Sequence, residues 1–170
     1  MRPTLFIKKI LISILVLGCW NLYLAQEKAL IKLLNRELKK EIKNQLKSPN
    51  FNGDTISIIK EFTIDHKNNL TFQIKKTSPY FSGYQIIKQE VPLTKIRYIG
   101  KDIQIILEAE PNTVITTTTT VDQTRKQQTI TGSLFFLYLS NEKENEDLGH
   151  TLQKTFEKAG YIVGKEYWYD

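Results

Sequence analysis

The chain has 170 residues and one cysteine, and its 24 Lys and Arg residues against 18 Asp and Glu residues give a net charge of +6. This length suits a single domain with a core large enough to be stable without crosslinks. Because Cys19 is the only cysteine, the sequence excludes a disulfide framework within the chain, and packing must hold the fold together.

Residues 1–25 are predicted to be an export signal. Arg2, Lys8 and Lys9 precede an apolar run over residues 10–25, and the first acidic residue is Glu27. This run of 16 residues is short for a membrane-spanning helix, which needs roughly 20 residues, but it is typical of a signal peptide.

Two processing sites compete within this segment. Ala25, followed by Gln26, provides the small residue that signal peptidase I requires, and "LYLAQ" resembles the export signals of Bacteroidota secreted proteins. The stretch "VLGC" resembles a lipobox, in which Cys19 would carry the lipid, but the apolar run continues beyond it. We expect cleavage between Ala25 and Gln26. The alternatives are an outer-membrane lipoprotein lipidated at Cys19 and an uncleaved anchor.

Residues 26–50 are predicted to form a basic amphipathic helix that ends before Pro49. Apolar residues recur every four positions from Leu30 to Leu46 and form one stripe. Residues 27–47 carry seven bases and three acids. This segment therefore carries a net charge of +4, and the three bases of the leader carry another +3. The remainder of the chain is near −1, so the positive charge outside the leader belongs to this helix. We expect the stripe to pack on the domain; the alternative is that the basic face contacts an anionic membrane.

Residues 51–170 are predicted to form an antiparallel β domain with a C-terminal helix, so that 26–170 is one folded unit. Alternating apolar residues and turn signals indicate about seven strands, of which "TISIIKEFTID" and "LTFQIKK" form the clearest hairpin. The most apolar stretch, "QTITGSLFFLYLS", is predicted to be one strand with a bulge at Gly132. A helix follows over 148–160, and "YIVGKEYWYD" is either a last strand or a packed aromatic tail.

The predicted fold class is α+β, with an N-terminal amphipathic helix, an antiparallel sheet or partly closed barrel of about seven strands, and a C-terminal helix. In the order and spacing of its elements, and in the segment "VPLTKIRYIGKDIQIIL", the chain resembles pleckstrin-homology-like barrels over residues 55–160. That resemblance implies a helix that plugs one open end of a barrel. The basic ligand-binding pattern of the phosphoinositide-binding members is not recognisable here, so no ligand follows from it. The alternative is an open antiparallel sheet with helices on one face.

The sequence offers little for catalysis. It contains none of the common nucleotide-binding, hydrolase or metalloprotease motifs and only two histidines. Glu146 and His150 are four residues apart, as a metal pair requires, but two ligands do not make a site. His66 lies in a predicted turn, and the threonine run from Thr116 to Thr120 is predicted to be a half-exposed strand. Thr55, after Asp54, matches a three-residue pattern for O-glycosylation and is expected in a loop.

We therefore expect an exported protein, periplasmic or secreted, that needs no cofactor and is not an enzyme. The expected function is binding of, or structural support for, an unknown ligand or protein of the cell envelope. A membrane-surface protein that uses the basic helix and a small enzyme inhibitor are the alternatives. Nucleic acid is not expected as a partner, because the basic helix carries no interleaved aromatic residues.

Overall fold

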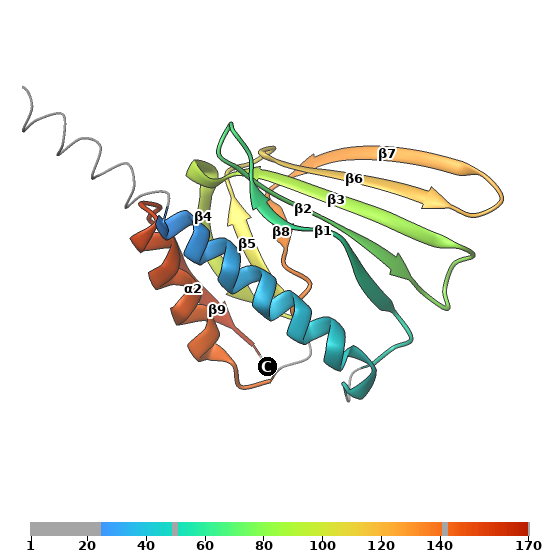
Figure 1. Ribbon diagram of the computed structural model, residues 1–170, viewed down its shortest axis with the longest axis horizontal. Helices are drawn as coiled ribbons and strands as arrows, with labels where there is room; N and C mark the ends of the chain where they lie inside the picture. The colour runs from blue at the N-terminus through green and yellow to red at the C-terminus, as the bar shows by residue number, and fades with distance from the viewer. Residues whose placement is uncertain (1–24, 49–50, 141–142, 170) are drawn as a thin grey trace, which may run out of the picture.

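The computed structural model describes residues 25–48, 51–140 and 143–169 (Figure 1). The elements along the chain are a helix over 25–44, here called the N-terminal helix, then η1 (Gln45–Lys47), β1 (Thr55–Ile64), β2 (Asn69–Thr77), β3 (Tyr84–Pro92), η2 (Leu93–Lys95), β4 (Ile96–Lys101), β5 (Ile105–Ala109), β6 (Val114–Val121), β7 (Arg125–Gly132), β8 (Leu134–Phe136), α2 (Glu146–Lys158) and β9 (Gly164–Trp168). The fold is α+β, as predicted.

The strands form two sheets. A five-stranded antiparallel sheet has the order β1-β2-β3-β6-β7, and a four-stranded sheet has the order β8-β5-β4-β9. The described strands thus number nine where about seven were expected, and they form no closed barrel. The single strand predicted over "QTITGSLFFLYLS" is wrong: the chain leaves the first sheet at Gly132 and enters the second at Leu134.

The C-terminal segment forms a strand and also packs its aromatic side chains, so it combines the two expected alternatives. β9 is the one parallel neighbour among the described strands, pairing with β4 after the chain has passed through α2. The ring of Tyr167 lies directly on Gly100, and the ring of Trp168 lies on Gly149 in α2. A Cβ atom at either glycine would lie under 3 Å from the ring, so both positions need glycine for this close approach.

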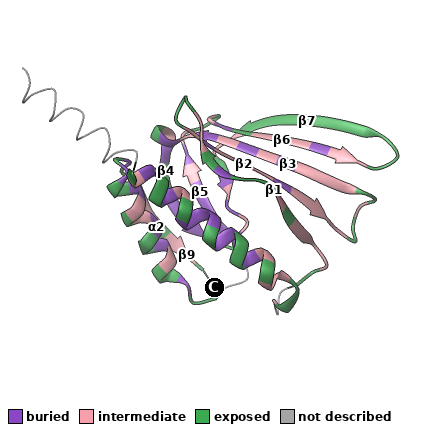
Figure 2. Cartoon of the chain, in the orientation of Figure 1, coloured by how far each residue is buried: buried purple, intermediate pink, exposed green. Residues whose placement is uncertain are grey.

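The core lies between the two sheets and both helices (Figure 2). The rings of Phe62, Phe72 and Phe135 meet at its centre, with centroids 4.5 to 6.4 Å apart. From the N-terminal helix, Leu30, Leu34 and Leu38 are fully buried in this cluster. The stripe therefore packs on the domain as predicted, apart from its last member: Leu46 lies in η1 and is 68% exposed.

Two irregularities in β1 explain why Lys60 breaks the apolar alternation of that strand. The register against β2 shifts once between Ile58 and Lys60 and again between Lys60 and Thr63. Each shift adds one residue to β1, so the first turns Lys60 away from the core face and the second returns Phe62 to it. Lys60 is accordingly exposed while Phe62 is fully buried.

The N-terminal helix runs along the outer edge of β1 and is held there by two side-chain amides (Figure 1). Asn35 donates to the carbonyl of Phe62 at 3.0 Å and accepts from its N–H at 2.7 Å. Gln45, in η1, does the same for Ile56, at 3.1 and 2.8 Å. Each amide thus satisfies one backbone donor and one backbone acceptor of the edge strand. We call these two pairs of hydrogen bonds the amide clamps.

The opposite edge of the same sheet is β7, which is exposed along its length (Figure 2). Seven of its eight residues are exposed, and Gly132 is intermediate. Its neighbour β6 contains the threonine run, which is half-buried except for the buried Thr119. The prediction of a half-exposed strand for this run is confirmed.

Candidate binding site

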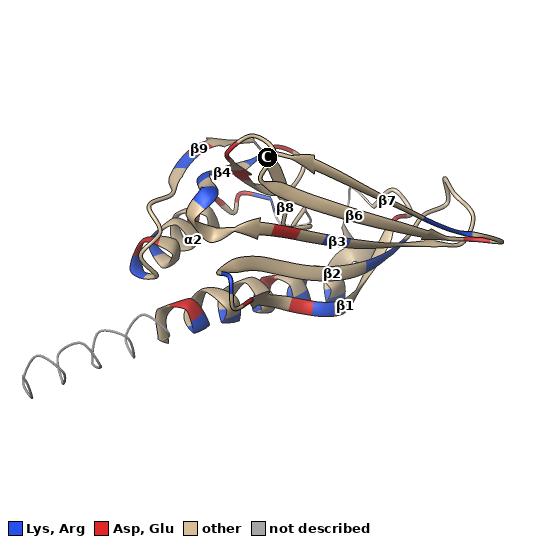
Figure 3. Ribbon diagram, turned by 90° about the horizontal axis from the view of Figure 1, so that it is seen from above, with Lys and Arg blue, Asp and Glu red and all other residues tan. Residues whose placement is uncertain are grey.

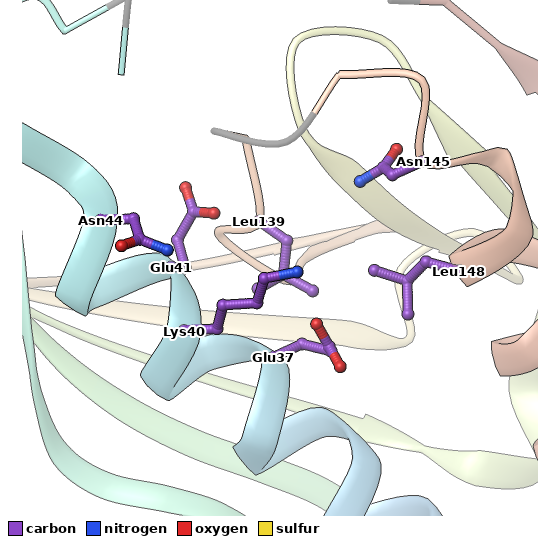
Figure 4. A pocket seen from close by; sticks show the side chains of 7 residues that line it. All are labelled: Glu37, Lys40, Glu41, Asn44, Leu139, Asn145 and Leu148. Carbon is purple, nitrogen blue, oxygen red and sulfur yellow. The ribbon is translucent and has the colours of Figure 1, made fainter. Parts of the chain in front are cut away.

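Two adjoining pockets lie beside the second half of the N-terminal helix. The first, here the Lys40 pocket, has a volume of about 190 Å³. It is lined by Glu37, Lys40, Glu41, Asn44, Leu139, Asn145 and Leu148 (Figure 4). The helical spacing of Glu37, Lys40 and Glu41 places these three side chains on one face, and Figure 4 shows all three directed into the same space.

The second, here the Lys76 pocket, has a volume of about 210 Å³ and shares Glu41 with the first. It lies where η1, the start of β1, the end of β2 and the β4–β5 turn come together. It is lined by Glu41, Gln45, Ser48, Phe51, Asn52, Asp54, Ile56, Lys76, Ile103, Gln104, Tyr138 and Ser140. Most of the lining residues carry polar side chains, and the exposed apolar side chains of Phe51 and Ile103 lie among them.

An ion pair between Asp54 and Lys76, 2.6 Å long, is part of the Lys76 pocket. Burial raises the pKa of Asp54, but hydrogen bonds with Lys76 and Ser78 and the charge of Lys76 outweigh this effect, so the pKa lies below its usual value. The Oδ1 atom of Asp54 is buried and accepts no hydrogen bond. The carboxylate is therefore ionised at neutral pH and keeps unused acceptor capacity.

Tyr138, which lines the same pocket, has a strained backbone conformation. Its φ angle is 56°, a left-handed conformation that is uncommon for an aromatic residue. The Gln104 side chain accepts from its N–H at 3.1 Å, and its ring meets the edge of Phe72. Burial raises the pKa of Tyr138 to about 12. Such strain, roughly 1–3 kcal/mol, persists only where the surroundings hold it, and it clusters at functional sites.

The carboxylate of Glu41, which separates the two pockets, is engaged in a contact that stabilises the fold. Its Oε1 atom accepts from both the N–H and the hydroxyl of Ser140, each at 2.9 Å. The carboxylate of Glu37 accepts from Arg36 at 2.6 Å. Glu41 therefore ties the helix to the 137–140 segment, whereas Glu37 pairs within the helix. The pockets are thus lined by polar groups that are already held in place.

The histidines considered from the sequence lie away from both pockets. His66 is in the β1–β2 turn, as expected, and His150 is exposed on α2. Glu146, which was considered with His150 as a metal pair and set aside, pairs with Lys165 at 2.5 Å. No group of three His, Cys, Asp or Glu side chains suited to a metal ion occurs among the residues that the structure describes.

The remaining predicted sites fall in different places. Thr55 is the first residue of β1, so its expected position in a loop is wrong, and its hydroxyl is 2.5 Å from that of Thr77. Ala25 and Gln26 lie in the N-terminal helix. Cys19 lies outside the described residues. Cleavage, lipidation and glycosylation remain predictions.

The residues that form the pockets and the clamps were not identified from the sequence. A signal was available for some of them: Lys76 continues the alternation of Leu70, Phe72 and Ile74, and Asn35 follows Leu34 on the buried stripe. A polar residue at a position that the pattern assigns to the core needs a partner. The sequence alone does not show which partner that is.

Comparisons with protein-family models, with curated proteins and with solved structures find no match to this chain. The resemblances to Bacteroidota export signals and to pleckstrin-homology-like barrels therefore gain no support from known proteins. Over the described ranges, no helix has the length and apolar character needed to cross a membrane.

Proposed function

We propose that this chain is an exported, non-enzymatic protein of the cell envelope and that it binds a small polar ligand in the Lys76 pocket. The observation that carries the proposal is a preformed pocket that places Glu41 and the Asp54–Lys76 ion pair beside the exposed side chains of Phe51 and Ile103. The leader expected over 1–25 supports export to the periplasm or the outside. Lipidation at Cys19 remains the alternative route to the envelope.

The chemistry of the pocket favours a ligand that donates hydrogen bonds. Two carboxylates, Glu41 and Asp54, face a single base, Lys76, so the pocket lining carries a net negative charge. A ligand with an amino or hydroxyl group complements this charge. Ile103, which is 80% exposed, and Phe51 offer apolar contact to the rest of such a ligand.

Thermal melts in the presence of primary amines, amino sugars and neutral sugars test this function. We expect at least one of these classes to raise the melting temperature, because ligand binding stabilises the folded state. Matched carboxylic acids, which carry the opposite charge, should have no effect. The Ile103→Lys variant, which removes the apolar contact and brings a positive charge to the acidic pocket, should lose the response, whereas Ile162→Lys, at a site that is 88% exposed and outside both pockets, should keep it. No shift with any donor class, or equal shifts in both variants, would contradict binding in this pocket.

A second candidate function is peripheral binding to an anionic membrane, and the outward face of the N-terminal helix favours it. Figure 3 shows Lys and Arg positions along this helix. Its exposed bases are Lys28, Lys32, Arg36, Lys39, Lys40, Lys43 and Lys47. Each base near an anionic surface contributes roughly 1 kcal/mol, and salt weakens this contribution. Co-sedimentation with phosphatidylglycerol vesicles should then fall with added salt and in a Lys32→Glu, Lys43→Glu double variant. Salt-independent binding, or none, would exclude this candidate.

A further inference from the structure

The two edge strands of the five-stranded sheet, β1 and β7, differ in whether side chains from other elements bind their outer backbone groups. At β1, the amide clamps of Asn35 and Gln45 occupy backbone groups that a neighbouring strand would otherwise pair with. In the second sheet, the free edge of β8 is only three residues long, and the Gln89 side chain accepts from the N–H of Phe136 there at 3.0 Å. Within the described part of the chain, β7 has β6 as its one strand partner.

Over most of its length, β7 also lacks the features that keep an edge strand from pairing. Such features are bulges, prolines, short length and charged residues along the edge. The register of β7 against β6 is continuous over all eight residues, from Arg125 to Gly132. The bases Arg125 and Lys126 stand at one end, and the other six residues are uncharged. Its Thr129, Ile130 and Thr131 are β-branched and suit a paired strand.

We propose that β7 is an interaction surface and that its partner is β7 of a second copy of this chain, paired antiparallel. A two-fold axis would then join the two five-stranded sheets into one continuous sheet, in a closed, isologous contact. Residues that face each other across such an axis must project from the same face of the sheet. The axis therefore passes beside a residue and not between two residues, and the two registers that overlap most of β7 place it beside Gln128 or beside Thr129.

The charge pattern of β7 fits this pairing and not the parallel one. With the axis at Gln128, Lys126 of one copy lies opposite Ile130 of the other; with the axis at Thr129, it lies opposite Gly132. In both registers the bases face uncharged residues. A parallel, in-register copy would instead place Arg125 against Arg125 and Lys126 against Lys126, which is unfavourable. Because the contact is one strand wide, we expect a weak, concentration-dependent dimer.

Sedimentation velocity of the full chain, measured over a range of concentrations, tests the proposal. We expect a monomer–dimer equilibrium for the wild type and a monomer for the Gln128→Lys, Thr129→Lys double variant, because in either register this variant places lysine opposite lysine. The control is Thr151→Lys, Ile162→Lys, which adds the same charge at exposed positions on and beyond α2 and should dimerise like the wild type. Thermal melts check that both variants are folded.

Amide hydrogen exchange in the wild type gives a readout that needs no variant. Raising the protein concentration should slow exchange of alternate amides over 125–132, whose N–H groups point away from β6, and should leave β1 unchanged. The proposal is overturned if the wild type is monomeric throughout. It is also overturned if the edge variant associates as the wild type does, or if only larger assemblies form.

Discussion

At the scale of single residues, the fold depends on polar side chains placed where the hydrophobic pattern leaves backbone groups without partners. Asn35 is 9% exposed and uses both ends of its amide on the backbone of Phe62, across 27 residues of sequence. Gln45 repeats the arrangement at Ile56 in a half-buried setting. These two contacts align the helix with the irregular edge strand.

Replacing Asn35 by Ala should lower the free energy of unfolding by about 1–3 kcal/mol, because the N–H and carbonyl of Phe62 would stay buried without partners. Urea denaturation measures this loss. The matched control is Asn44→Ala, which removes an amide that makes no capping hydrogen bond at the start of η1. Equal midpoints for the two variants would show that the Asn35 clamp contributes nothing to stability.

A second residue-scale prediction concerns Asp54. Because hydrogen bonds and the charge of Lys76 hold its pKa below the usual value, Asp54 stabilises the fold above its unfolded pKa. That contribution is lost as the pH falls through the folded pKa. In Lys76→Met, the effect of Lys76 that lowers the pKa of Asp54 is removed, while the effect of burial that raises it remains. The pKa of Asp54 should therefore rise, and the free energy of unfolding should fall less on acidification.

Carbon-detected NMR titration of the Asp54 carboxyl group measures this shift. Lys88→Met is the control: Lys88 pairs with Glu90 of its own strand, β3, at 2.7 Å, so its loss should leave the pKa of Asp54 unchanged. An Asp54 pKa that is the same in Lys76→Met and in the wild type would mean that Lys76 does not set it.

At the scale of elements, the N-terminal helix is the best test of the packing argument. Its leucines are buried against the phenylalanine cluster while its bases are exposed, so its two faces have separate roles. The spacing of the leucines was sufficient to predict this division. The acids on its inner side were not anticipated: Glu27, Glu37 and Glu41 are each 8% exposed. Glu27 and Glu41 hold other segments by hydrogen bonds, whereas Glu37 pairs with Arg36 of the same helix.

Leu34→Ala or Leu38→Ala should cost about 2–5 kcal/mol of unfolding free energy, as truncations in a packed core do. Lys43→Ala, on the exposed face, should change it by less than about 0.5 kcal/mol. Denaturant melts with and without anionic vesicles separate the two faces. If the leucine variants were as stable as the wild type and lost only vesicle binding, the stripe would belong to a membrane and not to the core.

At the scale of the whole molecule, the predicted cleavage site adjoins the start of the folded unit. Glu27 is buried and accepts a hydrogen bond from the Tyr161 hydroxyl at 2.7 Å, whereas Ala25 is exposed. Intact mass of the exported protein should therefore give a chain that starts at Gln26, with Glu27 and its contact kept. Fatty-acid labelling that disappears in Cys19→Ala would instead establish the lipoprotein.

The sequence predicted those features that depend on local periodicity. The α+β class, both helices and most strand positions follow from the spacing of apolar residues and from turn signals. The division into two sheets did not follow, because the break at Gly132 and Ser133 lies inside one continuous apolar pattern. The pockets did not follow either, since Glu41, Asp54 and Lys76 come from elements whose neighbours depend on tertiary packing.

The bond between Glu27 and Tyr161 makes the start of the N-terminal helix depend on the C-terminal end of the chain. It joins residues 134 positions apart, and during synthesis the N-terminal end emerges long before its partner. The leucine stripe can pack on Phe62 and Phe72 once β1 and β2 have been made, but the start of the helix gains its contact with Tyr161 only when the C-terminal end follows. Contacts of such long range slow folding and prolong the exposure of apolar surface. The N-terminal helix is therefore covered in two stages, first by β1 and β2 and last by the segment that carries Tyr161.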